Sequence, residues 1–166
     1  MTRILVIGSN GAGKSTFARC LAEKTGLPLI HLDQIHWRGH WERRSAEEFE
    51  AIVFSEARKS GWIIDGNNIS SLYQRLPLAD TVFWFEFSPI ICFFNILKRG
   101  CRYYGKVRPD MPDQCAENLS FKFFRYAWNF NHANRQRITS LLSENPHLVV
   151  IRFTNRRQTN KYLADI

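Results

Sequence analysis

The feature that most constrains the fold is a glycine-rich octapeptide that directly follows a short apolar run. Residues 4–7 read Ile-Leu-Val-Ile, and residues 8–15 read Gly-Ser-Asn-Gly-Ala-Gly-Lys-Ser. The apolar run is typical of a buried parallel strand, and the apolar residues after position 16 recur at helical spacing. The octapeptide fits G-x-x-x-x-G-K-[ST], and its position between a strand and a helix predicts a phosphate-binding P-loop.

Phosphate binding explains why each of these residue types occurs in the loop. Glycines let the backbone curl so that several N–H groups point at phosphate oxygens, and the helix N-terminus adds a favourable dipole. We expect Lys14 to reach the β- and γ-phosphates and the Ser15 hydroxyl to ligate Mg²⁺. A glycine-rich turn that matches by chance is the alternative, and the Lys-Ser pair disfavours a dinucleotide site. The residues assigned to nucleotide binding are Gly8, Ser9, Asn10, Gly11, Ala12, Gly13, Lys14, Ser15 and Thr16.

Further apolar segments predict an α/β fold. Strands are expected near residues 3–7, 27–32, 62–64, 81–87 and 148–151, with helical patterns between them. This alternation predicts a three-layer α/β/α arrangement around a parallel sheet, with ligands beyond the carboxyl ends of the strands. The length of 166 residues fits one domain.

Two aspartates follow predicted strands and are candidate site residues. Asp65 ends an apolar strand as a Walker B aspartate does, so we expect it to hold Mg²⁺, although an Asp-Gly turn has the same pattern. Asp33 ends the second strand, where it could accept a proton from an acceptor hydroxyl; a helix cap or turn is the alternative.

The net charge of +8 is unevenly distributed. Acidic and basic residues balance over residues 1–97, so the whole excess lies in residues 98–166 and predicts an anionic partner. Residues 98–115 are predicted to form a basic loop or lid, with Arg99, Arg102 and Arg108 clamping the transferring phosphoryl group. A solvated basic loop or a nucleic-acid face are the alternatives.

A long helical region is predicted over residues 116–142, with a break near residues 129–134 as the alternative, and its first part mixes aromatic and basic residues. Such mixing can indicate single-stranded nucleic-acid binding. Leu119, Phe123, Ala127 and Phe130 fall on one helical face, which favours a core role for most of this segment.

Other site classes are disfavoured. The four cysteines have no metal-ligand spacing, and the histidines form no zinc constellation. Residues 81–97 are apolar but too short and too polar to span a membrane, so we expect no membrane partner. No leader-like segment precedes the first strand, and we expect a cytoplasmic protein.

Several segments together resemble one family. They are Gly8–Ser15, His31-Leu32-Asp33 with Trp37 and Trp41 beyond it, Trp62-Ile63-Ile64-Asp65-Gly66-Asn67, Asp80, and Gly105-Lys106-Val107-Arg108-Pro109-Asp110. This set resembles the adenylate-kinase-like P-loop proteins called DNA topology modulation proteins. The resemblance implies a nucleoside-monophosphate-kinase-like sheet in the order 2-3-1-4-5, an acceptor-binding insert over residues 34–60 and a lid over residues 98–115. It also implies that adenine lies near the loop after the last strand, around Arg152 to Arg156, with Arg152 as a nucleotide-binding residue.

The sequence departs from adenylate kinases at the acceptor site. Those enzymes continue Asp-Gly with Phe-Pro-Arg, whereas here Asp65-Gly66 continues with Asn67-Asn68-Ile69. A hydroxyl compound is therefore at least as plausible an acceptor as a nucleoside monophosphate, while Arg38, Arg43 and Arg44 keep an anionic acceptor open. The favoured hypothesis is an ATP- and Mg²⁺-dependent phosphotransferase with a small-molecule acceptor. The alternative is a nucleotide-gated nucleic-acid-binding protein, and the sequence does not indicate the oligomeric state.

Overall fold

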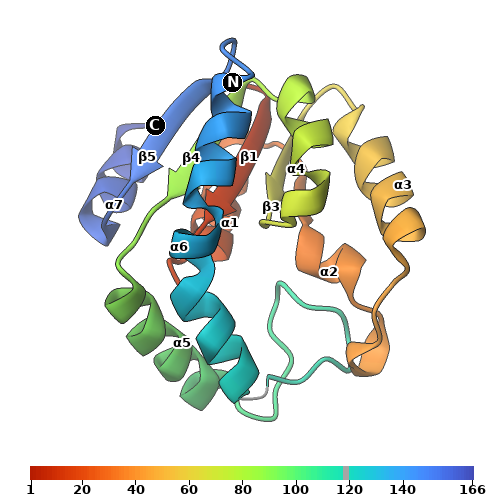
Figure 1. Cartoon of the computed structure of the whole chain (residues 1–166), viewed down its shortest axis with the longest axis vertical. Coiled ribbons are helices and arrows are strands. Elements are labelled where there is room, and N and C mark those ends of the chain that lie inside the picture. The colour runs from red at the N-terminus through yellow and green to blue at the C-terminus, as the bar shows by residue number, and fades with distance from the viewer. Residues whose placement is uncertain (118–119) are drawn as a thin grey trace.

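Five parallel strands form one sheet in the order β2-β3-β1-β4-β5. The computed structural model describes residues 1–117 and 120–166. The strands are β1 (Arg3–Gly8), β2 (Leu29–His31), β3 (Trp62–Asp65), β4 (Thr81–Phe85) and β5 (Val149–Phe153). This is the expected strand order, and it places β3 and β4 on either side of the P-loop strand β1 (Figure 1).

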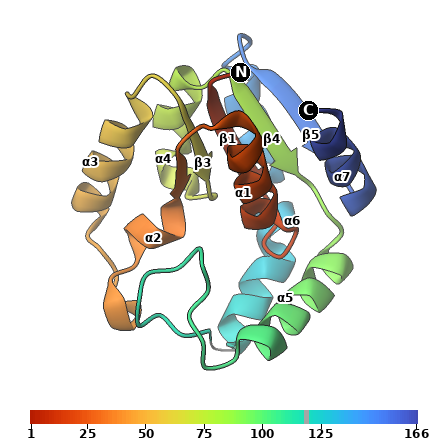
Figure 2. The ribbon, with the colours of Figure 1, turned by 180° about the vertical axis from the view of Figure 1, so that it is seen from behind.

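Helices cover both faces of the sheet because both faces are apolar. Along β1, Ile4 and Val6 belong to one core cluster, while Leu5 and Ile7 belong to the other, as the alternation of side chains in a strand requires. Helices α1 (Lys14–Thr25) and α7 (Arg156–Asp165) cover the first face. Helices α3 (Ala46–Ala57), α4 (Ile69–Arg75) and α6 (Phe121–Ser143) cover the second (Figures 1 and 2).

The remaining elements gather beyond the carboxyl ends of the strands. They are α2 (Leu32–His36), the 3₁₀ turn η1 (Gly39–Trp41), α5 (Pro89–Tyr103) and the loop over residues 104–117, whereas the 3₁₀ turn η2 (Leu76–Leu78) leads into β4. Figure 2 shows α2, this loop and α5 together at the lower end of the molecule, with both chain termini at the opposite end. The space beyond the P-loop is therefore enclosed by segments that are far apart in sequence.

Three sequence predictions about local structure need correction. The second strand stops at His31, so Asp33 lies in the first turn of α2 rather than at a strand end. Residues 98–103 are the last turns of α5, so the predicted basic loop begins only at Tyr104. The long helix begins at Phe121; Ala127 and Phe130 are buried as predicted, and Leu119 lies outside the described residues. Among the described residues, no helix combines the length and apolarity needed to cross a bilayer.

Candidate active site

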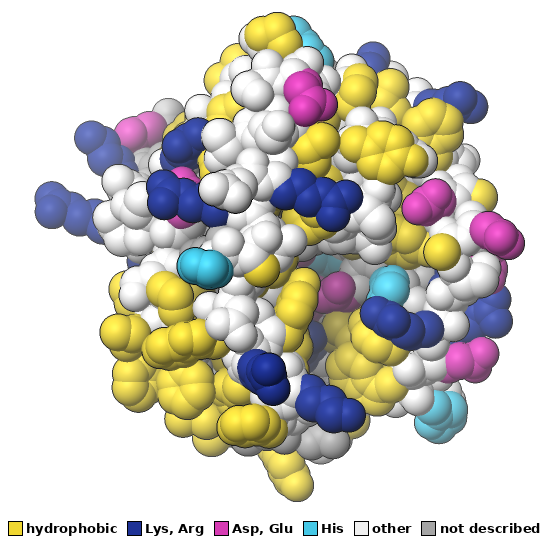
Figure 3. Space-filling view, viewed as in Figure 1, with side chains coloured by type: hydrophobic (Ala, Val, Ile, Leu, Met, Phe, Trp, Pro, Cys, Tyr) yellow, Lys and Arg dark blue, Asp and Glu magenta, His cyan; other side chains and the backbone are white. Residues whose placement is uncertain are grey.

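A cavity of about 1380 Å³ lies at the carboxyl ends of the strands. Its walls come from the P-loop, the ends of β2 and β3, helices α2, α5 and α6, and the loop over residues 104–117. Figure 3 shows the hollow in the middle of one face, with acidic and histidine side chains inside it and basic side chains on its rim. A pocket for one small ligand measures about 300–1,000 Å³, so this cavity has room for more than one ligand.

The lining is strongly basic. It includes nine Lys or Arg and four Asp or Glu residues. A concave surface with this excess of positive charge attracts polyanions, because low-dielectric walls concentrate the field inside a cleft. The charge of the lining therefore fits a polyphosphate ligand.

The P-loop has the backbone shape that phosphate binding requires. Gly8, Gly11 and Gly13 have φ of 119°, 83° and 91°, values that residues with a side chain rarely adopt. A Cβ on Gly8 would lie 2.1 Å from the carbonyl oxygen of Phe85, and one on Gly11 would lie 2.6 Å from that of Cys92. Gly13 is the N-cap of α1 and has no side chain to occupy the first backbone N–H groups of the helix. The loop thus presents an open cradle at a helix N-terminus, which suits an anion.

Lys14 is folded back against this cradle. Its ammonium group donates hydrogen bonds of 2.9 Å to the carbonyl oxygens of Gly8 and Ser9. Burial lowers the pKa of Lys14, and the nearby carboxylates of Asp65 and Asp33 oppose that shift. A cation that is held by two carbonyl groups inside the cavity needs only to turn to meet a phosphate.

Asp65 has the environment of a metal ligand. Register places the end of β3 beside the end of β2, where His31 Nδ1 lies 2.8 Å from Asp65 Oδ2. The other carboxylate oxygen, Oδ1, is buried and has no hydrogen-bond partner among the described residues. Burying a carboxylate oxygen without a partner costs free energy unless a cation or a water molecule binds to it. Together with the Ser15 hydroxyl, which lines the same cavity, this oxygen fits a Mg²⁺ ion.

Asn67 joins β3 to the P-loop, although the sequence analysis gave it no such role. Its Oδ1 accepts a 2.8 Å hydrogen bond from the backbone N–H of Gly8, and its Nδ2 lies 3.4 Å from Asn10 Oδ1. The buried Arg75 donates to the carbonyl oxygens of Asn67 and Asn68, and burial lowers its pKa to about 9. The motif Asp-Gly-Asn was visible in the sequence, but the partner of the asparagine was not.

Asp33 lines the cavity from the first turn of α2. Its side chain is exposed by accessible surface, yet it lines the cavity, whose walls displace part of its hydration. This desolvation and the neighbouring carboxylate of Asp65 raise the pKa of Asp33, against the opposing effects of Arg108 and Lys14. A carboxyl group with a raised pKa is a better proton acceptor than an ordinary aspartate.

Two of the three predicted clamp arginines, Arg99 and Arg108, are joined in an ion-pair network with Asp110 and Glu117. Arg108 Nε lies 2.5 Å from Glu117 Oε2, and Arg108 NH1 lies 2.8 Å from Asp110 Oδ2. Glu117 Oε1 also lies 3.4 Å from NH2 of Arg99. Arg102 lines the cavity with its guanidinium 5.5 Å from the ring centre of Tyr103. The network holds two cations at the cavity wall in defined positions.

The loop over residues 104–117 closes against the predicted acceptor insert. Gln34 Nε2 donates to the carbonyl of Pro109 at 3.0 Å, and Trp41 Nε1 donates to that of Ala116 at 3.1 Å. Cys115 Sγ lies 3.1 Å from the carbonyl oxygen of Arg38. These contacts join the loop to the insert along one side of the cavity.

Most residues predicted for the site line one cavity. From the P-loop these are Asn10, Gly11, Gly13, Lys14, Ser15 and Thr16, and from elsewhere Asp33, Asp65, Arg99, Arg102 and Arg108. Gly8, Ser9 and Ala12 instead shape the loop from beneath, since Ala12 is buried in the core and Ser9 Oγ lies within hydrogen-bond distance of the Phe85 and Phe87 carbonyl oxygens.

Arg152, the other residue expected at the nucleotide, lies outside the lining of this cavity. Its guanidinium lies 4.6 Å from the ring centre of Trp84, and the residue does not contribute to the described cavity lining. Residues alternate along β5, so Arg152 and Phe153 point to opposite faces of the sheet. Arg156, at the start of α7, lines the cavity beside Gly13 instead.

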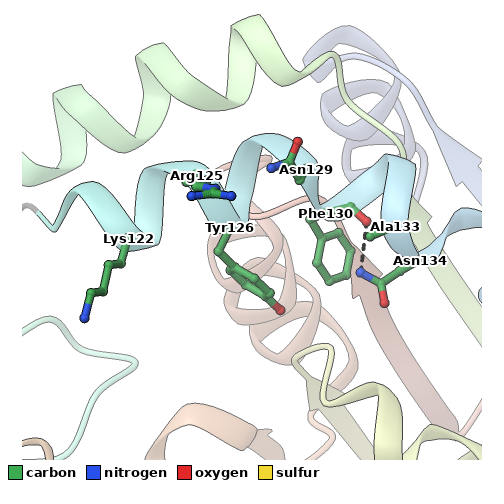
Figure 4. Close-up of a pocket in the computed structure, with 7 residues that line it drawn as sticks. All are labelled: Lys122, Arg125, Tyr126, Asn129, Phe130, Ala133 and Asn134. Atoms are coloured by element: carbon green, nitrogen blue, oxygen red, sulfur yellow. Dashed lines mark hydrogen bonds between the residues drawn. The ribbon is translucent and has the colours of Figure 1, made fainter.

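A shallower groove of about 420 Å³ runs along α6 (Figure 4). Lys122 and Tyr126 line both this groove and the main cavity, and Asn134 donates a 3.0 Å hydrogen bond to the Phe130 carbonyl. The groove is therefore a side branch of the main cavity rather than a separate site.

Comparison with known proteins supports the assignment of the P-loop to nucleotide binding. Residues 4–72 match the family model described as the ATPase family associated with various cellular activities (AAA), and this segment contains the P-loop and Asp65. The chain has the P-loop NTPase fold. No curated protein sequence matches the chain. The family match covers less than half of this P-loop protein and supports nucleotide binding and ATPase chemistry.

Proposed function

We propose that this P-loop protein is an ATP- and Mg²⁺-dependent phosphotransferase that acts on a small acceptor, most favourably a hydroxyl compound. One observation carries the proposal. The cavity that contains the P-loop is also lined by Asp33, His36, Trp37 and Trp41 of the α2–η1 segment and by Arg43 just after it. Hydrolysis of ATP by water does not need such a second lining of aromatic and titratable side chains.

The residues have complementary roles in this reaction. Lys14 turns from the Gly8 and Ser9 carbonyls to the β- and γ-phosphates, and Ser15 and Asp65 would hold Mg²⁺. When bound, the metal neutralises charge on the β- and γ-phosphate oxygens. The acceptor hydroxyl oxygen bonds to the γ-phosphorus, the bond to the ADP oxygen breaks, and the hydroxyl proton passes to Asp33. Arg99 and Arg102 face the cavity from α5, where they can stabilise charge on the transferring group.

Closure and topology also support transfer. The contacts between residues 104–117 and the α2–η1 segment would help to enclose bound substrates, and enclosure disfavours the competing hydrolysis. The strand order 2-3-1-4-5 is the one implied by the resemblance to adenylate-kinase-like proteins.

The charges around the insert favour a hydroxyl acceptor over a nucleoside monophosphate. Of the three arginines that kept an anionic acceptor open, Arg38 and Arg44 both pair with Glu48. Arg43 remains at the cavity, with its guanidinium 5.6 Å from the ring centre of Trp37. A phosphate-bearing acceptor would therefore meet one arginine of the insert together with the carboxylate of Asp33.

The proposal is tested by measuring ADP formation with Mg·ATP alone and with pools of small hydroxyl metabolites, nucleosides and nucleoside monophosphates. We expect a hydroxyl pool to raise turnover above the ATP-only rate, and Lys14→Ala to lower that turnover by about 10²–10³-fold. Lys24→Ala, at the exposed end of the same helix, is the matched control and should keep full turnover.

Background turnover with every pool would contradict the phosphotransferase. The alternative, a nucleotide-gated nucleic-acid-binding protein, would then be tested by a DNA titration with and without ATP at two salt concentrations. Stimulation by nucleoside monophosphates alone would keep the transferase and overturn the preference for a hydroxyl acceptor.

A further inference from the structure

The outer face of α5 is apolar and exposed. Ile90, Ile91, Phe94 and Leu97 are all solvent-exposed, and Phe94 keeps 62% of its surface accessible. Figure 3 shows hydrophobic side chains gathered over the α5 region at the lower left of the molecule. A neighbouring part of the same helix faces the cavity, since Asn95 Nδ2 donates to the Gly11 carbonyl and Lys98 lines the cavity.

Helix α6 extends this surface. Phe121 keeps 84% of its surface accessible, and Trp128 is about half exposed. The two helices are joined by aromatic contacts, because the ring of Phe93 lies 5.7 Å from that of Phe94, 5.3 Å from that of Phe124 and 6.3 Å from that of Trp128. We name the exposed set Ile90, Ile91, Phe94, Leu97, Phe121 and Trp128 the apolar face.

The charged side chains of α5 and α6 are all basic. The two helices contain seven Lys or Arg residues and no Asp or Glu. Four of these cations, Lys98, Arg99, Arg102 and Lys122, line the main cavity, and Arg135 pairs with Glu86. The exposed Lys98 and Arg125 each follow an apolar-face residue by four positions, Phe94 and Phe121, so they lie beside that face on the helix surface. Contiguous exposed apolar patches on a globular fold mark an interaction site, and cations beside the patch favour an anionic partner.

We propose that the apolar face docks the protein on an anionic lipid surface. Aliphatic and aromatic side chains on one side of a helix, with Lys and Arg beside them, form the arrangement that lies in the interface of a bilayer without crossing it. A second copy would bring two sets of cations together, and a nucleic acid would gain little from Ile90, Ile91 and Leu97, which cannot stack on bases. The sequence analysis expected no membrane partner because residues 81–97 are too short and too polar to span a bilayer, and that reason does not apply to a helix face that lies on the membrane surface. The inference is independent of the proposed phosphotransfer.

The test is co-sedimentation of the full chain with two kinds of vesicle, pure phosphatidylcholine and phosphatidylcholine with about a third replaced by phosphatidylglycerol. We expect binding to the anionic vesicles that weakens as salt rises. Phe94→Ser should reduce that binding about tenfold, because a Phe side chain loses its apolar burial, and should leave ATP turnover unchanged. Tyr73→Ser, which alters an exposed aromatic residue of α4, is the matched control and should bind like the original chain.

A second readout locates the contact. Trp62 and Trp84 are buried, and Trp37 and Trp41 line the cavity, so Trp128 is the tryptophan on the apolar face. Acyl chains labelled with bromine should quench part of the fluorescence, and Trp128→Phe should abolish that part while most vesicle binding remains.

Three results would overturn the proposal. One is equal sedimentation with and without both kinds of vesicle. Another is a dimer in solution that Phe94→Ser dissociates, without any vesicle binding. The third is binding to a single-stranded oligonucleotide that Phe94→Ser weakens while vesicles are not bound.

Discussion

The two halves of the cavity are built by different means. The nucleotide half is made by consecutive residues of the P-loop, whose shape depends on backbone dihedrals and on a buried strand on each side. The acceptor half, formed by the α2–η1 segment and the loop over residues 104–117, is joined by side-chain hydrogen bonds across roughly 75 residues, such as Trp41 with Ala116 and Gln34 with Pro109. Ion pairs within residues 99–117 add to it. A local, covalently contiguous site tolerates little change in its backbone, whereas a site assembled from distant side chains can vary its specificity without loss of the fold.

Gly8→Ala should prevent the P-loop and its strand β1 from folding correctly. The new Cβ would lie 2.1 Å from the Phe85 carbonyl oxygen at a φ of 119°, so β1 and β4 could not keep their register. We expect little or no folded protein, measured by circular dichroism and by the yield of monodisperse chain. Gly26→Ala is the matched control, because Gly26 also has positive φ but no described atom lies within 4 Å of the added Cβ. That variant should fold and lose about 1 kcal/mol of unfolding free energy. If both variants lose the same amount of stability, the backbone strain at positive φ decides the result, and the close approach of Gly8 to β4 does not.

Glu117→Gln should weaken the acceptor half while the P-loop stays intact. Glu117 lies between the guanidinium groups of Arg99 and Arg108, so its neutralisation leaves buried positive charge without a full counter-charge. We expect the unfolding free energy to fall by about 3–5 kcal/mol and trypsin to cleave faster after the exposed Lys106. The exposed Glu23→Gln should change neither quantity. Unchanged cleavage after Lys106 would show that the ion pairs do not hold the loop closed.

Asp33→Asn should lower phosphoryl transfer to the acceptor without weakening nucleotide binding. Acceptor-dependent turnover is expected to fall about 10²-fold, because the amide cannot take the hydroxyl proton, while nucleotide binding measured by calorimetry should stay within about twofold. Enclosure by the cavity walls and the neighbouring Asp65 raise the pKa of Asp33, so turnover should fall as the pH drops through a value above the ordinary aspartate range. That acid limb should be missing in the variant, and its persistence would assign the proton acceptor to another group.

Asp80→Asn, at the far end of the sheet, should give the smallest effect and serve as a reference for both halves. Burial opposes the charge of Asp80, but hydrogen bonds from Thr81, Thr2 and Arg3 outweigh it and lower its pKa to about 2. We expect a loss of about 1–2 kcal/mol in unfolding free energy at neutral pH, with turnover per folded molecule unchanged. Since the folded pKa is depressed, the difference from the original chain is full above 3.8 and disappears as the pH falls toward 2. If denaturation curves show the same difference in unfolding free energy at every pH in that range, the ionised carboxylate of Asp80 is not what stabilises the fold.

Local patterns predicted the parts of the site that are contiguous in sequence. Residues 8–16 and Asp65 were identified because strand, loop and helix signals follow one another along the chain. Asp33 was placed at a strand end, but β2 is only three residues long and the aspartate lies on α2. The helical start of the predicted lid was missed because Gly100 and the run of cations resemble a loop, whereas the buried face formed by Cys92, Ile96 and Gly100 continues the helix.

The sequence by itself determined the nucleotide half, the parallel α/β architecture and the concentration of positive charge in residues 98–166. These follow from glycine dihedrals, apolar periodicity and composition, which are properties of short segments. Tertiary structure alone decided that Asn67 holds the P-loop, that Asp65 pairs with His31 and that Glu117 joins two arginines. It also decided that Arg156 rather than Arg152 faces the cavity and that one side of α5 stays uncovered. Each of these depends on which distant side chains meet in space, and pairing across the fold leaves no periodic signal along the chain.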